Sequence, residues 1–382
     1  MNLPKLYSRS SVGALLEWTA EVSNNKFRVI AGQVDGAKVT SDWTICKGKN
    51  TGKANETSDA EQALNEAQSK WDKKARMGYT PDVKKVDSCM TYVEPMTAKK
   101  LPDRIKKIDW KKGVLVQNKY NGHRCVATAE GMTVILKTRT GKLYYSVPHI
   151  KKDLEKFFAK YPEAVLDGEL FNNELRTRLN EISSLLRQGE DATIEDLNAS
   201  EELIRFYVYD GYNFGDDLDQ DSDYELRKEF IDKNLPKFCK YCLTVKTDKA
   251  FSMAEVDVIY QAYLKDEQEG AIIRIPNSGY ENKRSNNLLK YKPVDDDECK
   301  ILKLIEGEGN WAGTAKTATI LWKGKTFDAT FKGTWEQGAE RLKNKADWEG
   351  KSGVTFLFNG LTGLGIPNYA RIDPDNCFQG EK

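Results

Sequence analysis

The chain has 382 residues, which is enough for two or three domains of about 150 residues each. Apolar residues make up 39% of the chain and charged residues 31%, a composition that supports packed cores and excludes disordered, collagen-like and coiled-coil proteins. The 59 basic and 58 acidic side chains give a net charge of +1, which argues against a histone-like polycation but permits local basic faces.

Residues 1–85 predict a short antiparallel β-meander followed by one helix. Apolar and polar residues alternate over 16–22, which is typical of a half-buried strand, and Asp35-Gly36 indicates a hairpin turn. The run Ser58-Asp59-Ala60-Glu61 matches a capping box and predicts a helix that ends before Gly78. The segment has 14 basic and 10 acidic residues and is mildly positive.

Residues 86–293 interleave strand-like and helix-like stretches, which predicts a mixed α/β domain. Leu175, Leu179, Ile182 and Leu186 recur at helical spacing between two apolar runs. Five such runs predict buried strands, at 114–116, 134–136, 164–166, 206–209 and 271–273.

Residues 294–382 predict a small β-barrel, because four short strands follow one another between glycine-containing turns. These strands are expected at 301–304, 318–322, 327–331 and 354–358, with one polar helix at 335–345. The whole chain is therefore expected to be an α+β protein of three domains.

The hexapeptide KYNGHR at 119–124 follows the first strand of the middle domain and is the first candidate for chemistry. A lysine is a nucleophile only when its amine is neutral, and nearby cations or desolvation favour that form by lowering its pKa. Lys119 ends a strand, Gly122 permits a tight turn beside it, and Arg124 supplies a nearby cation. By itself the hexapeptide also fits a surface lysine in a turn.

Further charged and aromatic residues follow at the ends of predicted strands. Each has an ordinary structural interpretation as well: a hydrogen-bonded turn for the carboxylates, core packing for the aromatic residue, and a solvated edge for alternating lysines. The segments are Thr138-Arg139-Thr140-Gly141, Asp167-Gly168-Glu169, Tyr207-Val208-Tyr209-Asp210, Glu269-Gly270 and Lys290-Tyr291-Lys292.

Taken together and in this order, these segments resemble the motifs of the covalent nucleotidyltransferases, the superfamily of ATP-dependent polynucleotide ligases and mRNA capping enzymes. The superfamily motifs are K-x-D-G-x-R, an arginine-bearing S-R-x-G, D-G-E, an aromatic block that ends in Asp, E-G-hydrophobic, and K-x-K. Counterparts of all six occur in order across 119–292. The tail from Gly360 through Gly363 to Asp373 is similar to the end of the oligonucleotide-binding (OB) barrel of compact DNA ligases.

The resemblance implies an adenylation domain at 86–293 and an OB-fold domain at 294–382. Residues 1–85 are similar to WGR-type modules, although the name-giving Trp-Gly-Arg is missing and Trp43 lies nearest to its place. This first module is therefore expected to bind nucleic acid or to dock another protein.

The implied activity is that of an ATP-dependent DNA ligase of compact phage or bacterial type. Such an enzyme joins 5′-phosphate and 3′-hydroxyl ends at a nick through a lysine-AMP intermediate and an adenylylated 5′ end. The implied cofactors are ATP and Mg²⁺, with Mn²⁺ as a substitute. The implied partner is nicked double-stranded DNA, with RNA-containing strands as a variant, and the protein is expected to be a monomer.

The resemblance also assigns roles to individual residues. Lys119 is the expected nucleophile, Lys290 and Lys292 hold the α-phosphate, and Arg124 and Arg139 contact ribose or phosphates. Glu169 and Glu269 bind the ribose and the metal, Tyr209 stacks on adenine, Gln117 reads the base amine, and Arg371 orients pyrophosphate. Two residues depart from the family pattern: Asn121 stands where Asp is usual, and Asn368 where related tails often have Arg.

Three other functions remain open from the sequence. An RNA or mixed-strand ligase uses the same phosphoryl chemistry, and an mRNA guanylyltransferase shares the core motifs, including a run like LLKYKP at 288–293. A non-catalytic nucleic-acid binder on a ligase scaffold is the third, although it would not need Lys119 together with all the other charged motif residues. ATP is favoured over NAD because no nicotinamide-type module is evident.

The seven cysteines are an odd number spread along the chain, which favours a reducing compartment over a disulfide framework. Cys239 and Cys242 form one C-x-x-C, but no second Cys or His pair follows at zinc spacing, so we interpret them as incidental thiols. No run approaches the ~20 apolar residues of a membrane helix, and Glu17 interrupts the apolar stretch near the N-terminus. We expect no membrane association and no signal peptide, and a cytoplasmic location, in the host cell if the protein is phage-encoded.

Overall fold

The computed structural model describes residues 1–382 apart from 11, 53, 88–91, 103, 188, 216–217, 294, 363 and 374–382. The chain divides into two units, one made of residues 1–90 and 293–382 and the other of residues 91–292. Gly363 of the tail motif lies outside the described residues. Within the described part of the chain, no helix combines the length and the apolar character that a membrane crossing requires.

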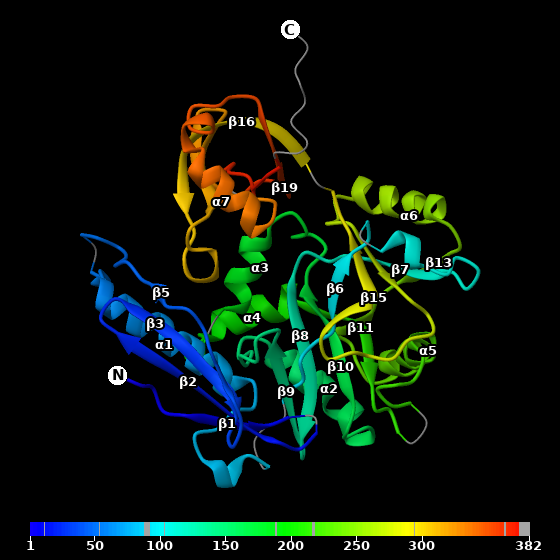
Figure 1. Cartoon of the computed structure of the whole chain (residues 1–382). Coiled ribbons are helices and arrows are strands. Elements are labelled where there is room, and N and C mark those ends of the chain that lie inside the picture. The colour runs from blue at the N-terminus through cyan, green and yellow to red at the C-terminus, as the bar shows by residue number, and fades with distance from the viewer. Residues whose placement is uncertain are drawn as a thin grey trace. The chain divides into compact units, whose positions relative to one another are not determined.

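An antiparallel sheet and one helix make up the first 85 residues (Figure 1). Helix α1 (Asp59–Arg76) begins at the predicted capping box: the Ser58 hydroxyl accepts from the Glu61 amide, and the Glu61 carboxylate accepts from the Ser58 amide at 2.8 Å. Ala63 and Ala67 on α1 are fully buried in the core that the helix shares with the sheet. The strands, in the order β1-β2-β3-β4 with β5 on β3, are β1 (Leu6–Arg9), β2 (Leu15–Ser23), β3 (Lys26–Gln33), β4 (Lys38–Thr40) and β5 (Thr44–Ile45).

The described residues from 295 to 373 form a closed barrel with the strand order β16-β17-β18-β20-β19. Ile301, Ile320 and Phe356 are fully buried inside it. The prediction of a small barrel is confirmed, and closure leaves no free sheet edge. Its elements are β16 (Asp295–Glu306), β17 (Ala315–Trp322), β18 (Lys325–Phe331), α7 (Trp335–Lys343), β19 (Val354–Phe358) and β20 (Arg371–Ile372).

Two five-stranded sheets form the framework of residues 91–292 (Figure 1). One has the order β12-β11-β10-β8-β9 and the other β13-β7-β14-β15-β6. The strands are β6 (Thr97–Lys100), β7 (Val114–Asn118), β8 (His123–Glu130), β9 (Thr133–Thr138), β10 (Val165–Phe171), β11 (Arg205–Tyr212), β12 (Cys242–Thr244), β13 (Thr247–Ala250), β14 (Ala271–Arg274) and β15 (Arg284–Tyr291). The helices are α2 (Pro148–Lys160), α3 (Leu179–Leu186), α4 (Ile194–Leu203), α5 (Tyr224–Asn234) and α6 (Met253–Lys265).

Three apolar clusters hold this unit together. Phe157 of α2 is buried in a cluster with residues of the first sheet, β12-β11-β10-β8-β9. Val256 of α6 is buried in a cluster with residues of the second sheet, β13-β7-β14-β15-β6. A third cluster joins the two sheets to each other, because Val126 and Tyr212 of the first pack with Leu288 of the second. The two sheets therefore pack against each other, and the predicted site residues of this unit lie on strands of both sheets or directly beside the ends of those strands.

Three details of the prediction are wrong. The helix predicted from Leu175 begins at Leu179, and Leu175 is buried just before it. The carboxylates of the Asp-Gly-Glu segment and the aromatic Tyr209 lie within strands rather than at strand ends. Strand β10 continues through the Asp-Gly-Glu segment because it pairs with β8 on one side and β11 on the other. Its pairing with β11 has a register shift between Asp167 and Gly168.

Candidate active site

Lys119, Glu269 and Lys292 come together at one point of the unit. Lys119 follows β7, and its backbone amide donates to Gly270 O at 3.0 Å, which aligns it with the segment before β14. The Lys119 Nζ atom forms an ion pair with Glu269 Oε2, and Lys292 Nζ lies 3.5 Å from Glu269 Oε1. The three side chains are 21%, 24% and 22% exposed, so the cluster is partly desolvated and still within reach of a ligand.

Two glycines permit this close approach. A Cβ atom on Gly122 would lie 2.4 Å from Leu170 O and 3.0 Å from Glu169 Cγ, so the loop after Lys119 can approach β10 only with glycine there. Gly270 has φ +141°, and a Cβ atom on it would lie 2.4 Å from Tyr291 O. At both positions, in the K-x-x-G and the E-G segments, a side chain would clash with a neighbouring strand, which explains why glycine is present there.

Glu169 on β10 is electrostatically linked to the same cluster. Burial raises the pKa of Glu169 to about 7, the charges of Lys119 and Arg124 act in the opposite direction, and Glu269 raises it further. On the opposite sheet, burial and the positive charges of Lys292 and Lys119 lower the pKa of Lys290. The site thus holds two carboxylates among three lysines drawn from four chain segments.

Arg124 on β8 is held by an aspartate that the sequence did not single out as a site residue. Arg124 Nε donates to Asp167 Oδ1 at 2.5 Å, and its Nη2 donates to Met96 O at 2.9 Å. Tyr280 donates its hydroxyl to Asp167 Oδ2 at 2.7 Å, so this fully buried carboxylate has partners on both oxygens. The guanidinium carbon of Arg124 lies 5.0 Å from the centre of the Tyr209 ring. Asp167 therefore positions Arg124 next to the predicted stacking residue.

Gln117 on β7 is 1% exposed, and its amide is already bonded within the protein. Its Oε1 accepts from Arg274 Nε at 2.9 Å, and its Nε2 donates to Tyr224 Oη at 2.8 Å and to Thr247 Oγ1 at 3.0 Å. The Tyr224 hydroxyl in turn donates to the Tyr209 carbonyl at 3.0 Å. A base amine at this point would have to share the Gln117 oxygen with Arg274.

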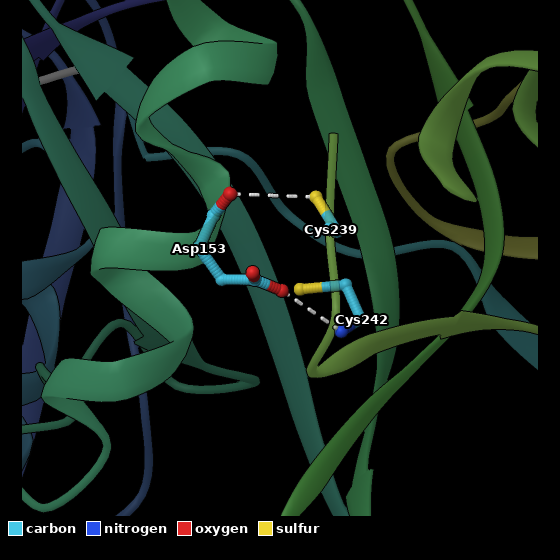
Figure 2. A group of neighbouring side chains, drawn as sticks. All are labelled: Asp153, Cys239 and Cys242. Carbon is cyan, nitrogen blue, oxygen red and sulfur yellow. Dashed lines mark hydrogen bonds between the residues drawn. The ribbon is translucent and has the colours of Figure 1, made fainter. Parts of the chain in front are cut away.

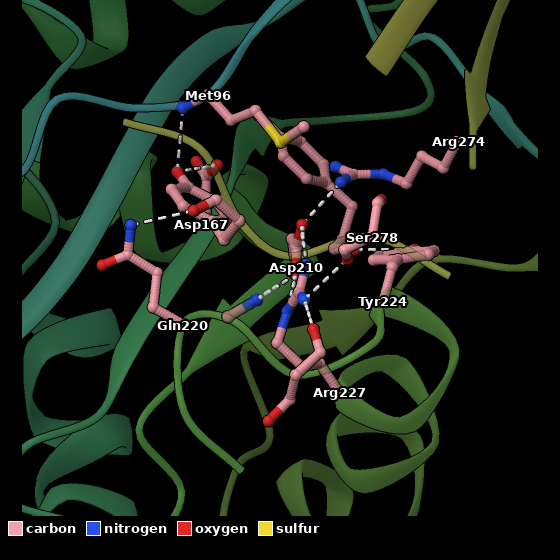
Figure 3. A network of polar contacts seen from close by, with 12 residues as sticks. Met96, Asp167, Asp210, Gln220, Tyr224, Arg227, Arg274 and Ser278 are labelled. Carbon is pink, nitrogen blue, oxygen red and sulfur yellow. Dashed lines mark hydrogen bonds and ion pairs between the residues drawn. The ribbon is translucent and has the colours of Figure 1, made fainter. Parts of the chain in front are cut away.

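A buried ion network supports these side chains from behind (Figure 3). Asp210 accepts from Arg274 Nη1 at 2.6 Å and from Arg227 Nε at 3.1 Å, and all three residues are at most 3% exposed. Arg274 Cζ also lies 5.3 Å from the Tyr209 ring centre, so Tyr209 has two guanidinium neighbours, one from each sheet. Asp210 entered the sequence analysis only as the last residue of an aromatic motif, and Arg274 was not predicted as a site residue. The available signal was that each is a charged residue next to an apolar strand run.

Two predicted arginines are exposed. Arg139 is exposed in the turn after β9, where its carbonyl accepts from the Tyr92 hydroxyl at 2.5 Å. Arg371 belongs to β20 of the barrel, in the other unit, where it is exposed and lines a cavity of about 450 Å³ together with Lys316 and Lys332. Three of the residues that line the cavity are basic, and one of them, Lys332, forms an ion pair with Asp373.

The geometry can support phosphoryl transfer to an amine. A lysine at the centre supplies the nucleophile, the neighbouring lysines supply positive charge for phosphate oxygens, and two carboxylates supply the oxygen ligands that Mg²⁺ prefers. Glu169 fits a cation ligand in particular, because burial raises its pKa and a bound cation would favour its charged form.

Comparisons with known proteins agree on one family. The family model described as ATP dependent DNA ligase domain matches residues 95–292. The DNA ligase of African swine fever virus (strain Badajoz 1971 Vero-adapted) is 30% identical over 294 residues, which cover 74% of this chain and 64% of that protein. The DNA ligase of Haemophilus influenzae is 24% identical over 224 residues, which cover 56% of this chain and 72% of that protein. The chain thus spans less than two thirds of the length of the viral relative.

Solved structures share the fold. The structure named Pmar-Lig_PreS3 superposes with a TM-score of 0.59 at 17% identity and covers 76% of this chain and 69% of its own. A Lig E DNA ligase structure, described as DNA binding with a minimal scaffold, gives a TM-score of 0.55 at 20% identity and covers 74% of this chain and 98% of its own. At these identities the likeness concerns the fold, and it agrees with the predicted α+β class.

Proposed function

Because this chain belongs to the family of ATP-dependent DNA ligase domains, we propose that it seals nicks in duplex DNA with ATP as the energy source. The observation that carries the proposal is the shared carboxylate of Glu269, which contacts Lys119 from 150 residues away and Lys292 from 23 residues away. Lysine adenylylation requires a nucleophilic amine beside a cation that can neutralise the α-phosphate, and this cluster has both.

In the first step, neutral Lys119 Nζ attacks the α-phosphorus of ATP. The N–P bond forms as the bond from that phosphorus to the bridging oxygen breaks, and pyrophosphate leaves with the electron pair. For this to happen Nζ must lose a proton and leave its ion pair, and Glu269 is the adjacent base. Lys290 and Lys292 would hold the α-phosphate oxygens, while Tyr209 would stack on adenine and Arg371 would orient pyrophosphate.

In the second step, an oxygen of the DNA 5′-phosphate attacks the phosphorus of the lysine-AMP, and the P–N bond breaks as the amine takes up a proton. In the third, the 3′-hydroxyl oxygen attacks the 5′-phosphorus, loses its proton, and displaces AMP. All three are in-line displacements, so the protein contributes positioning and charge neutralisation. Arg124 and Arg139 are the proposed contacts to ribose or phosphates.

Glu169 and Glu269 are the proposed ligands of Mg²⁺ or Mn²⁺. When bound, such an ion would neutralise charge on the reacting phosphates. Both carboxylates belong to the cluster around Lys119, and their oxygen donors match this class of metal.

We also propose a role for each of the three regions of the chain. Residues 86–293 would form the adenylation domain, residues 294–382 the OB-fold domain that engages DNA, and residues 1–85 a module for nucleic acid or protein docking. A monomeric state and a cytoplasmic location remain predictions.

The proposal is tested by incubating the full chain with Mg²⁺ and α-labelled ATP or GTP, after pyrophosphate treatment to remove any bound AMP. The label is followed on the intact protein for wild type, Lys119→Ala, and Lys111→Ala as a matched control, because Lys111 is an exposed lysine before the same strand. We expect acid-labile label from ATP only, absent in Lys119→Ala and retained in Lys111→Ala. A chase with nicked DNA should transfer the label to AMP and join the strands.

Each other outcome would indicate a different function for this protein. Label from GTP would indicate a capping guanylyltransferase, and efficient joining only with RNA at the junction would indicate an RNA or mixed-strand ligase. No label from either nucleotide would reject the covalent mechanism and leave a nucleic-acid binder.

A further inference from the structure

The C-x-x-C loop meets helix α2 at Asp153 (Figure 2). From the sequence this loop has two thiols and no second ligand pair at zinc spacing. The fold supplies a third donor from 86 residues earlier in the chain. The Cys239 Sγ atom, the Cys242 Sγ atom and a carboxylate oxygen of Asp153 all lie within 4.8 Å of one another.

The loop holds the Asp153 carboxylate in a fixed orientation. Oδ1 accepts from the Lys240 amide at 2.9 Å, and Oδ2 accepts from the amides of Tyr241 at 2.7 Å and Cys242 at 3.2 Å. A carboxylate has about four lone-pair positions, so these three amide bonds leave one on the side of the thiols, where the Cys242 side chain also hydrogen-bonds to Asp153. The Cys239 thiol donates to the Asp153 carbonyl at 3.5 Å, which keeps its sulfur beside the same residue.

Burial differs among the three donors. Cys242 is 2% exposed and belongs to the main core, whereas Cys239 and Asp153 are partly exposed. A small ion could therefore reach the site from the side of Cys239, while Cys242 provides a rigid sulfur position.

The Asp153 carboxylate favours metal binding over thiol-disulfide exchange as the function of this thiol pair. Thiol-disulfide exchange needs a thiolate, and reactive cysteines have positive neighbours that stabilise it. A negative charge against both sulfurs works against that chemistry. The same negative charge strengthens the attraction for a divalent cation, and sulfur with carboxylate oxygen is an accepted ligand combination for zinc.

We propose that Cys239, Cys242 and Asp153 bind one thiophilic divalent cation of the zinc class. Binding would release the two thiol protons and form two metal–sulfur bonds and one metal–oxygen bond, with water in the fourth position. The ion would tie α2 to the start of β12, the edge strand that pairs with β11, and Tyr209 lies on β11. The ion would thereby stabilise the sheet that carries part of the proposed nucleotide site.

The test uses the full chain, reduced with a phosphine and stripped with a chelator, and then titrated with Co²⁺. Excess Mg²⁺ is present to occupy carboxylate sites, because Mg²⁺ prefers oxygen ligands. We expect one equivalent of Co²⁺ to produce thiolate-to-cobalt charge-transfer absorbance, which Zn²⁺ then abolishes by displacement. Absence of this absorbance in reduced protein overturns the proposal.

Three variants sharpen the test, and circular dichroism checks that each is folded. Cys239→Ser should abolish the absorbance, and Asp153→Asn should weaken Co²⁺ binding about tenfold or more. Cys46→Ser should leave it unchanged, because Cys46 pairs with the single carboxylate of Glu66 at 3.6 Å and is a matched thiol–carboxylate control. Retained absorbance in Cys239→Ser, or unchanged affinity in Asp153→Asn, overturns the assignment. So does rapid loss of both thiols to glutathione disulfide in protein that gives no cobalt signal, which would identify a redox pair.

Discussion

Replacing Glu169 with glutamine should stabilise the protein while abolishing the proposed lysine adenylylation. Burial raises the pKa of Glu169 to about 7 from an ordinary value of 4.5, so the folded state holds a proton on this carboxyl group more tightly than the unfolded chain does. As the pH rises from 4.5 through about 7, the wild-type protein therefore loses folding free energy. The glutamine variant does not titrate at this position and keeps that free energy.

The size of the effect follows from the shift. At about 1.4 kcal/mol for each pKa unit, full expression of the shift above pH 7 corresponds to about 3 kcal/mol. Glu169 is partly exposed, so solvent screening reduces the expected gain to about 1–3 kcal/mol at pH 8.5, and to less than about 1 kcal/mol at pH 5. For a unit of this size, such a gain corresponds to a rise in Tm of about 3–8 °C at pH 8.5.

Thermal unfolding of metal-free protein at pH 5, 7 and 8.5 measures this directly, with Glu155→Gln as a control because Glu155 is an exposed glutamate on α2. The control should show no gain that depends on pH. Lysine adenylylation by Glu169→Gln should be lost, because the variant lacks the charged metal ligand. In wild type, adenylylation in limiting Mg²⁺ should fall as the pH drops below about 7, where Glu169 becomes protonated. A variant that is no more stable than wild type at pH 8.5, or equally stabilised at all three pH values, would refute the reasoning.

The other predictions concern the close approach of the motif loop, the main core and the buried ions. Gly122→Ala should cost about 2–4 kcal/mol in urea denaturation and slow adenylylation, because the new Cβ would lie 2.4 Å from Leu170 O; near-wild-type stability would mean that the loop can move away. Phe157→Ala should lower the free energy of unfolding by about 3–5 kcal/mol, since the ring is fully buried in the main core, and a loss below about 1 kcal/mol would contradict that packing. Arg227→Met should cost about 3 kcal/mol by calorimetry because it removes one of the two arginines on Asp210, and a neutral result would show that Arg274 alone satisfies that carboxylate.

Elements whose signals are local could be predicted from the sequence. The capping box at Ser58 determines where α1 begins, since the residues that satisfy the first helical amides are within three positions of one another. The central strands of the two large sheets were found because buried strands consist of consecutive apolar residues. Their ends were not found, because a strand continues as far as its neighbours pair with it, and this is why Glu169 and Tyr209 lie inside β10 and β11.

Contacts between distant segments could not be predicted by spacing. Helix α5 buries Arg227 and Lys228, and charged residues in a helix pattern ordinarily indicate a solvated face. They are buried here because carboxylates from elsewhere in the fold and on the next helical turn pair with them. Likewise, nothing near Cys239 in the sequence indicates that Asp153 lies beside it. The resemblance to the ordered family motifs identified both Lys119 and Glu269 as site residues. It could not predict that the two form an ion pair, because that contact depends on the fold.

The two-partner carboxylate of Glu269 has a consequence for the order of events. In the free protein Glu269 is paired with Lys119 on one oxygen and Lys292 on the other. In the proposed mechanism, attachment of AMP turns the Lys119 nitrogen into a phosphoramidate without positive charge, so Glu269 would keep only its pairing with Lys292. The negative charge of Glu269 would then be compensated less by lysine and would be directed more fully to the bound metal. Charging the lysine and joining the strands would therefore take place in different electrostatic surroundings.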